Sequence, residues 1–321
     1  MRAGPDPPQA GVRTGEVGAP PRGTSPEQAA RVAYLGPEGT FSEEALLSSA
    51  VQGSVEPVPR SSIYDTVMAL RAGEVEWAIV PIENSLDGSI SVTLDLLADE
   101  AEDVLIVGET LLTVRHSLIA GQLLELEEIE TVLSHPKVPG QCARFLRAEL
   151  AHAQVLPASS TAEAVREVVQ SAERGRAALG TRLAAEIYGG TVIREGVQDR
   201  DDNETRFVWL AQTTRGAAAT PLPLPPLRGT GEQVNWKTSL VFWGAGADSP
   251  GWLVRCLNEF ARRDINLTKI ESRPRRERLG HYMFFVDLEG ALAAERTVRD
   301  AVAELRELSE EVRVLGSYPA A

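Results

Sequence analysis

The sequence has 321 residues, 43% of them hydrophobic, and a formal net charge of −14 at pH 7. A chain of this length can bury more than one core, and its negative field opposes binding to nucleic acid or to an anionic membrane surface. Two cysteines without partners at metal-ligand spacing, no apolar run of membrane-spanning length and no apolar signal core predict a cytoplasmic protein without disulfides or a zinc site.

The first part of the chain reads as a tail followed by an α/β region. Residues 1–30 are Pro, Gly, Ala and Arg without periodicity, and we expect a disordered tail there. Short apolar runs then alternate with helical patterns up to residue 212, which favours parallel sheets of α/β type. Ligands of such sheets bind at the carboxyl ends of the strands, beside helix N-termini. The expected strands are 32–35, 77–80, 104–107, 131–133 and 206–210, with a helix from about Ser42.

A second Pro-rich segment at 213–236, which contains PLPLPP, predicts a semi-rigid linker. The pattern changes after it. Strands are expected at 238–243, 267–273, 281–288 and 312–316, with helices at 250–262 and 292–307. The order βαββαβ is typical of a ferredoxin-like fold. We therefore expect a second folded unit over 237–319.

Four strand-end loops combine glycine or proline with small polar residues. In the first, Thr40 and Glu43 have capping-box spacing, so a helix N-terminus there could hold an anion. The second crowds a carboxylate, an amide and hydroxyls into residues 80–89. Taken alone, each loop is better explained by local structure, the first as a well-capped turn and the second as an Asx-type turn.

The third loop is Ser134-His135-Pro136 followed by Gln141, and the fourth runs from Asp202 to Phe207. A lone histidine after a strand is typical of a structural cap. An arginine beside a threonine at a strand edge can clamp a carboxylate, or it can pair with the acidic residues next to it.

Five ordered motifs resemble those of prephenate dehydratase over nearly all of 31–212: GPEGTFSEEA, VPIENSLDGS, LSHPKVPGQC, SSTAEAV and NETRF. The stretches TSLVF, SPGWL, INLTKIESRP and HYMFFVDLEG resemble the ACT regulatory domain that follows the catalytic part in this family. Because no chorismate mutase segment precedes the first motif, the resemblance is to the monofunctional form.

This resemblance implies a catalytic part with two α/β lobes, like a type II periplasmic binding protein, and a site in the cleft between them. It places residues 31–108 plus about 190–212 in one lobe and about 112–187 in the other. The chain would cross between the lobes at 109–118 and again at 190–197.

The resemblance also implies chemistry without a metal or an organic cofactor, because loss of water and carbon dioxide makes the prephenate ring aromatic. It makes Thr205 the hydrogen-bond donor to the departing hydroxyl, and it surrounds the substrate with Asn84, Ser134 and Gln141. Arg206 is expected to clamp a carboxylate or to orient a lobe. Lys137 departs from the usual family residue and either attracts the dianion or faces solvent. Further substrate-binding candidates are Thr40, Ser42, Glu83, Ser85, Ser160 and Thr161.

An ACT domain implies feedback control by L-phenylalanine and a homo-oligomer, a dimer or tetramer, through an exposed sheet face. Trp252 stands where alanine is more usual, and its bulk could narrow the effector pocket. The unit could instead be a dimerisation module only. The implied effector-binding residues are Ser249, Pro250, Gly251, Trp252, Leu253, Asn266, Glu271, Ser272, Arg273 and Pro274.

Two other functions fit the motifs. One is the same reaction on arogenate, and the other is a non-catalytic aromatic amino-acid sensor, because the cleft fold also serves solute capture. Retention of the Thr205, Asn84 and Ser134 motif positions argues against the sensor.

Overall fold

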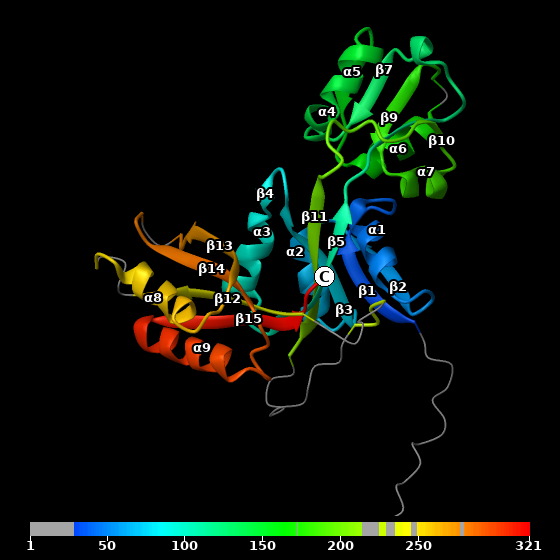
Figure 1. Ribbon diagram of the computed structural model, residues 1–321. Coiled ribbons are helices and arrows are strands. Elements are labelled where there is room, and N and C mark those ends of the chain that lie inside the picture. Colours follow the sequence, from blue (N-terminus) through cyan, green and yellow to red (C-terminus); the bar gives the residue numbers. More distant parts are fainter. Residues whose placement is uncertain (1–28, 172, 214–224, 229–234, 245–248, 277–278) are drawn as a thin grey trace, which may run out of the picture.

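The computed structural model describes residues 29–171, 173–213, 225–228, 235–244, 249–276 and 279–321. The expected N-terminal tail and most of the expected linker lie outside these residues. Figure 1 shows a lobe at the top, a central body below it, and a C-terminal unit beside that body. Within the described ranges, no helix is both long and apolar enough to cross a membrane.

The larger sheet runs from the central body through the C-terminal unit, in the order β13-β14-β12-β15-β5-β11-β3-β1-β2. In the central body, β1 is parallel to β2 and β3, whereas β11 is antiparallel to β3 and β5. Within the central body, the parallel pairing expected from the sequence is therefore found only among β1, β2 and β3. The strands of the body are β1 (Ala30–Leu35), β2 (Val55–Arg60), β3 (Trp77–Asn84), β4 (Gly88–Ser89, paired with β3), β5 (Val104–Thr113) and β11 (Glu204–Gln212).

Helices cover both faces of this part of the sheet. Helix α1 (Phe41–Ser49) packs on the face that carries Trp77, Ile79 and Trp209. The opposite face is covered by α2 (Ile63–Arg71), α3 (Ser91–Asp95) and a π-helical turn, η1 (Leu96–Glu100). Because both faces are buried, β3 reads as a nearly continuous apolar run that ends in polar residues.

The upper lobe in Figure 1 is built on the second sheet, in the order β10-β6-β9-β7-β8. Strands β7, β8 and β9 are parallel, and β6 is antiparallel to β9 and β10. The strands are β6 (Ser117–Ala120), β7 (Thr131–Ser134), β8 (Gln154–Pro157), β9 (Arg176–Gly180) and β10 (Thr191–Arg194). The helices are α4 (Val138–Gln141), α5 (Ala143–Glu149), α6 (Thr161–Gln170) and α7 (Arg182–Tyr188), with a 3₁₀ turn η2 (Leu126–Glu128).

The lobe boundaries differ from those expected. Strand β10 pairs with β6 and so belongs to the upper lobe, and β5 stays in the larger sheet to Thr113. The chain therefore crosses between the lobes at 114–116, within the first predicted range of 109–118, and at 195–203, which extends beyond the second predicted range of 190–197. The sequence marked these runs as extended, but an extended run does not say which strand it will pair with.

The C-terminal unit has the expected order βαββαβ, and its four strands are antiparallel in the order β13-β14-β12-β15. Its helices cover one face, over a core that includes Phe242, Phe260 and Leu305. The elements are β12 (Trp236–Trp243), α8 (Trp252–Ala261), β13 (Leu267–Pro274), β14 (Tyr282–Glu289), α9 (Arg296–Leu308) and β15 (Glu311–Pro319).

The other face of this unit is not free, contrary to the expectation of an exposed sheet face. Met283, Phe285 and Tyr318 are buried in one core with Leu94 and Leu97 of the central body. The reason is the sheet junction, where Gly316 of β15 pairs with Ile106 of β5. A Cβ at Gly316 would lie 2.2 Å from the Ile106 carbonyl oxygen, so only glycine allows this approach.

Candidate active site

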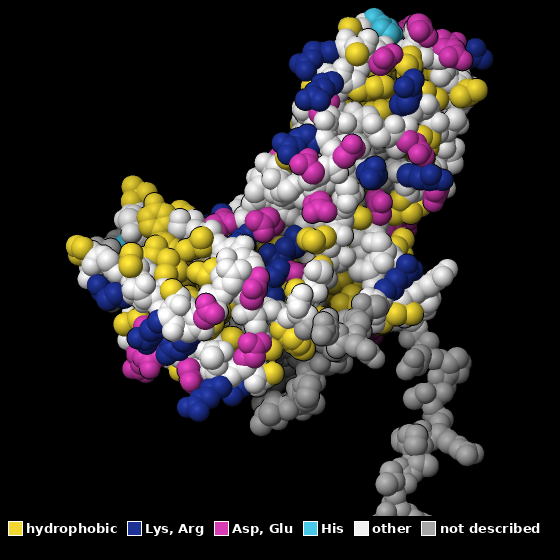
Figure 2. Space-filling model, in the orientation of Figure 1, with side chains coloured by type: hydrophobic (Ala, Val, Ile, Leu, Met, Phe, Trp, Pro, Cys, Tyr) yellow, Lys and Arg dark blue, Asp and Glu magenta, His cyan; other side chains and the backbone are white. Residues whose placement is uncertain are grey.

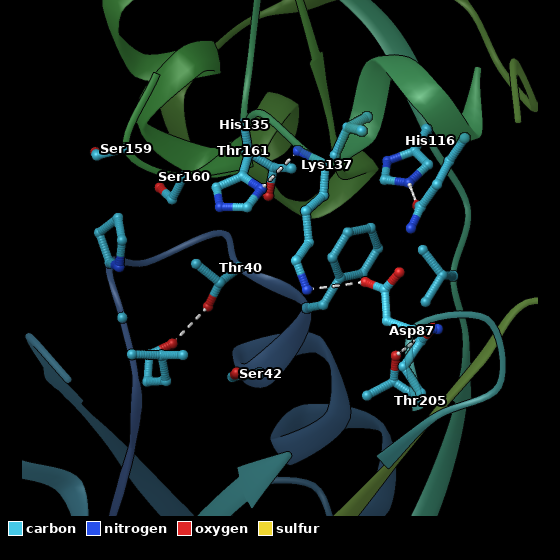
Figure 3. Close-up of a pocket in the computed structure, with 18 of the residues that line it drawn as sticks. Thr40, Ser42, Asp87, His116, His135, Lys137, Ser159, Ser160, Thr161 and Thr205 are labelled. Carbon is cyan, nitrogen blue, oxygen red and sulfur yellow. Dashed lines mark hydrogen bonds and ion pairs between the residues drawn. The ribbon is translucent and has the colours of Figure 1, made fainter. Parts of the chain in front are cut away.

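A cavity of about 420 Å³ lies between the upper lobe and the central body. Its wall includes residues from the crossings, His116 and Asn203, as well as from both lobes. Figure 3 shows the side chains of both lobes facing one another across it. Seven of the residues expected at the site line this cavity: Thr40, Ser42, Asn84, Gln141, Ser160, Thr161 and Thr205.

Thr205 and Asn84 meet because they are cross-strand partners of β11 and β3. The Asn84 side-chain oxygen accepts hydrogen bonds from the backbone N–H groups of Leu86 and Asp87, each at 2.9 Å. This fixes the amide so that Nδ2 donates to Thr205 Oγ1 at 2.9 Å. Because Oγ1 accepts that bond, its own proton is available to a group in the cavity.

A chain of amides connects this pair to the upper lobe. Asn84 Nδ2 also donates to Asn203 Oδ1 at 2.9 Å, and Asn203 Nδ2 donates to Gln141 Oε1 at 3.5 Å. His116 Nε2 lies 2.9 Å from the same Gln141 oxygen. Burial lowers the pKa of His116, although its bond to Gln141 opposes the shift, so the imidazole is neutral at pH 7. A neutral ring that donates to Gln141 leaves the Gln141 amide N–H groups for the cavity.

Two helices of more than eight residues begin at the cavity, one from each lobe. Thr40 is the N-cap of α1, and Ser160 is the N-cap of α6, where its hydroxyl accepts from the Glu163 N–H at 3.0 Å. The capping box expected at Thr40 is not formed. Thr40 donates instead to the Leu35 carbonyl at 3.0 Å, while Glu43 accepts from the Gly39 N–H. Helix N-termini favour anionic groups.

Formal charge in the cavity wall is sparse. Among the described lining residues, Lys137 is the only Lys or Arg, and Asp87 is the only carboxylate. The two pair across the cleft, with Lys137 Nζ 3.1 Å from Asp87 Oδ2. Burial and the Lys137 ammonium lower the pKa of His135, against the opposite effect of Asp87. Of the two readings left open for Lys137, the structure brings the side chain to the cavity while keeping it well exposed.

Four expected site residues do not line the cavity. Ser134 is buried, and its hydroxyl donates to the His135 carbonyl at 3.3 Å. Ser85 accepts from the Glu204 N–H at 2.9 Å, outside the cavity. Glu83 and Arg206 are themselves cross-strand partners, one position along from Asn84 and Thr205. Because side chains alternate along a strand, they face the opposite side of the sheet.

Arg206 instead sits at the contact with the C-terminal unit. Its guanidinium bonds Glu109 of β5 at 2.7 Å, Asp287 of β14 at 2.6 Å and the Tyr318 hydroxyl of β15 at 2.8 Å. Lys237 Nζ pairs with the other Glu109 oxygen at 2.6 Å. Burial acts to lower the pKa of Arg206, but Tyr318, Asp287 and Glu109 together raise it above its ordinary value. The expected carboxylate clamp binds protein carboxylates, and its role as a clamp on substrate is not supported by this placement.

The expected effector residues fall into three groups. Ser249 to Leu253 lie at the start of α8, and Glu271 to Pro274 lie at the end of β13, at the same end of the unit. Asn266 lies at the opposite end of β13, beside a second cavity of about 650 Å³. Within one chain, Arg273 pairs with Asp95 of α3 at 2.7 Å.

Trp252 is part of the core and not of an open pocket. It is 5% exposed, its ring centroid lies 6.0 Å from Phe242 and 5.9 Å from Phe284, and its Nε1 donates to the Leu308 carbonyl at 2.7 Å. The bulk of this residue is therefore taken up between α8, α9 and the sheet.

Several lining residues were not expected from the sequence. His116 and Asn203 belong to the crossings, and Asp87 lies in the turn after β3. Asn203 and Asp87 lie inside motifs that were recognised, so their polar side chains were a usable signal. His116 lies outside the five motifs, and a lone histidine carries no pattern that could have singled it out.

Comparisons with known proteins agree with this geometry. Residues 32–215 match the family described as Prephenate dehydratase. A curated Prephenate dehydratase of Mycobacterium marinum is 38% identical over 298 residues, covering 90% of this chain and 89% of that protein. A prephenate dehydratase of Arthrobacter aurescens, solved in complex with L-Phe, has a TM-score of 0.77 and 33% identity, with 90% of each chain covered. A second solved structure, GqqA, described as a novel type of quorum quenching acylase, has a TM-score of 0.76 and 26% identity, covering 91% of this chain and 98% of that one. The chain belongs to the prephenate dehydratase family of lyases.

Proposed function

We propose that this chain converts prephenate to phenylpyruvate, with residues 31–212 as its catalytic part. The observation that supports this best is the Thr205 hydroxyl, which accepts from Asn84 and keeps its own proton for the cavity. The two lobes, crossed twice by the chain around a cleft, suit the type II periplasmic-binding-protein arrangement expected from the sequence.

In this reaction the ring hydroxyl departs and takes up one proton to become water. The bond from the ring to its carboxylate then breaks, carbon dioxide leaves, and the electron pair of that bond completes the aromatic ring. A threonine hydroxyl is a weak acid, so Thr205 donates a hydrogen bond to the departing oxygen and relies on solvent for the proton consumed. A preorganised hydrogen-bond donor of this kind is typically worth about 10²–10³-fold in kcat.

The remaining lining groups hold the substrate. Gln141 and Asn84 supply fixed amides, and the starts of α1 and α6 supply N–H groups and the hydroxyls of Thr40, Ser42, Ser160 and Thr161 toward carboxylates. Ser134 does not touch the substrate; its hydrogen bond to the His135 carbonyl holds the backbone that carries His135 and Lys137.

The test is phenylpyruvate formation by Thr205→Ala and by Thr205→Ser, with circular dichroism to verify the fold. We expect the alanine variant to lose about 10²-fold or more of kcat and the serine variant, which keeps a donor, to retain most of it. Wild-type activity in Thr205→Ala would remove Thr205 from this role. Folded wild-type protein that turns over neither prephenate nor arogenate would favour the sensor function.

One observation favours arogenate as a second candidate substrate. Asp87 faces the cavity beside Lys137, and such a pair can hold the ammonium and carboxylate of an amino-acid side chain. Prephenate has a keto group in place of that ammonium. Parallel assays of both substrates decide between them by their kcat/KM ratio.

We also propose that residues 237–319 form an ACT domain through which L-phenylalanine inhibits the catalytic part. Support comes from the Arthrobacter aurescens relative solved with L-Phe, and from Arg206. Arg206 directly follows Thr205 on β11, and three strands of the C-terminal unit contact it or its partners, through Ser239, Asp287 and Tyr318. Turnover that phenylalanine does not alter would refute the effector assignment and leave the enzyme assignment intact.

Dimerisation through the edge strand β13 would complete the effector site. Figure 2 shows hydrophobic side chains gathered over the end of the C-terminal unit that carries α8, β13 and β14, where Ile270 is 51% and Val254 60% exposed. A two-fold antiparallel pairing of β13 centred on Ile270 would set Asn266 of one copy opposite Pro274 of the other. We expect Ile270→Lys to yield monomers in size-exclusion chromatography with light scattering and to lose phenylalanine inhibition.

A further inference from the structure

We propose that Lys137 is the residue that binds a substrate carboxylate in the cleft, and that it leaves Asp87 when substrate enters. This assignment rests on the proposed function and adds a substrate-binding residue to it. The observation behind it is the ion pair of Lys137 with Asp87 at the cavity. Among the described lining residues, no other Lys, Arg, Asp or Glu is present.

The geometry suits an exchangeable cation. Lys137 comes from the start of α4 in the upper lobe, and Asp87 from the turn after β3 in the central body. Figure 3 shows the lysine side chain extending across the cavity toward Asp87. The Lys137 and Asp87 side chains are 63% and 37% exposed, so water competes for both. An ion pair in that setting is weak, and a ligand carboxylate can replace its acidic partner at little cost.

The charge of the protein gives such a cation an advantage. The chain carries a formal net charge of −14, so a dianion approaches against the long-range field of the protein. Helix N-termini and amides supply partial positive charge in the cavity, but no other described lining residue is a Lys or Arg. Arg206, the nearest sequence candidate, is occupied by Glu109 and Asp287 on the opposite face of the sheet.

The kinetic test compares Lys137→Met, Lys137→Arg and Asp87→Asn with wild type. We expect Lys137→Met to raise the KM for prephenate about 10-fold with kcat changed much less, and Lys137→Arg to restore most of the loss. Asp87→Asn frees the ammonium and should lower that KM by about 2- to 5-fold. Arg200→Met, which removes the same charge from an exposed pair with Asp202 outside the cavity, serves as the control. Unchanged KM in Lys137→Met would overturn the proposal. Loss of arogenate turnover in Asp87→Asn, with prephenate unaffected, would assign the pair to arogenate and overturn it as well.

A second measurement does not depend on turnover. The chain has three lysines, and the other two are held in ion pairs, with side chains 15% exposed at Lys237 and 8% at Lys269. A limiting amount of an amine-acylating reagent should therefore modify Lys137 before the other two lysines, as read by peptide mass spectrometry. In folded Thr205→Ala, saturating prephenate should slow modification of Lys137 and leave Lys237 and Lys269 unchanged. An unchanged rate of Lys137 modification, with prephenate binding verified by calorimetry, would overturn the role of Lys137 whatever the wild-type activity. Absence of both prephenate binding and wild-type turnover would count against the proposed function as well.

Discussion

Replacing Arg206 by methionine should leave an uncompensated negative charge between the catalytic strand and the C-terminal unit. In the wild type, Arg206 and Lys237 balance Glu109 and Asp287, and all four side chains are at most 15% exposed. Methionine keeps much of the apolar stem of arginine but removes its charge. Breaking a buried ion pair from one side costs about 3–5 kcal/mol, because the remaining charge stays desolvated.

The hydrogen bonds around Arg206 make the loss cooperative. Arg206 donates to the Tyr318 oxygen, the Tyr318 hydroxyl lies 2.7 Å from Ser239 Oγ, and Ser239 donates to the Asp287 carboxylate at 2.5 Å. Asp287 in turn bonds Arg206 at 2.6 Å, which closes a ring of four groups. Burial raises the pKa of Tyr318 above its ordinary value, so it takes part as a neutral hydroxyl.

The assay is thermal and urea unfolding of Arg206→Met beside the double variant Arg206→Met/Asp287→Asn. A loss of about 3–5 kcal/mol should lower the midpoint by on the order of 10 °C. The double variant removes one charge of each sign, and an asparagine oxygen can still accept from Ser239. It should therefore recover most of the lost stability. A single variant within about 1 kcal/mol of wild type, or a double variant no more stable than the single one, would refute the charge argument.

Three further predictions test the site and the junction. Asn84→Asp keeps an oxygen that accepts from the Leu86 and Asp87 N–H groups, but it places a second acceptor oxygen beside Thr205. The Thr205 hydroxyl would then donate its proton to the new carboxylate and not to the substrate, so kcat in the phenylpyruvate assay should fall about 10²-fold. Unchanged kcat would contradict the assigned direction of the bond between Asn84 and Thr205. Burial holds the pKa of His116 below its unfolded value of 6.5, so the unfolded state takes up the proton first as the pH falls and stability decreases below that pH until the folded pKa is passed. His116→Gln should flatten thermal midpoints measured from about pH 7.5 to 5, and an equally steep profile in that variant would assign the loss to other groups. Gly316→Ala forces β15 away from Ile106 and should lower the free energy of unfolding by about 1–3 kcal/mol, with faster hydrogen exchange in β15 and β5. The matched control is Gly140→Ala, whose new Cβ meets nothing within 4 Å. Equal exchange rates in the two variants would argue against a tight junction.

Much of this architecture could be predicted from local sequence. Apolar runs identified β1, β3, β7 and β11 because strands buried on both faces need little else to be recognised. The edge strand β2 was not expected, since VEPVPR carries two prolines and little apolar content. Strand β10 was assigned to the wrong lobe, because pairing depends on tertiary packing that no local pattern records.

The site residues also show the difference between what local sequence predicts and what tertiary packing decides. Motif recognition found the residues whose side chains leave β3 and β11 toward the cavity, but it treated neighbouring motif residues as one group. Strand alternation, which is visible in the sequence, already separates Thr205 from Arg206 and Asn84 from Glu83. The sequence could not tell which face of β3 and β11 borders the cavity. That depends on where the upper lobe and the C-terminal unit pack, which is visible only in the folded chain.

That alternation also connects the cavity with the C-terminal unit. Adjacent residues of one strand must point to opposite faces, so β11 presents its hydroxyl donor to the cleft and its guanidinium to β14 and β15 of the C-terminal unit. A shift of the C-terminal unit that moves Asp287 and Tyr318 must therefore move Arg206, break its bonds, or move the strand that carries Thr205. A register irregularity lies directly beside this pair, because Arg206 is opposite Glu83 and Phe207 is opposite Pro81, so the pairing passes over Ile82; bulges of this kind alter the aim of nearby side chains. If L-phenylalanine acts through the C-terminal unit as proposed, the peptide bond between Thr205 and Arg206 is the last step of the connection from that unit to the cavity.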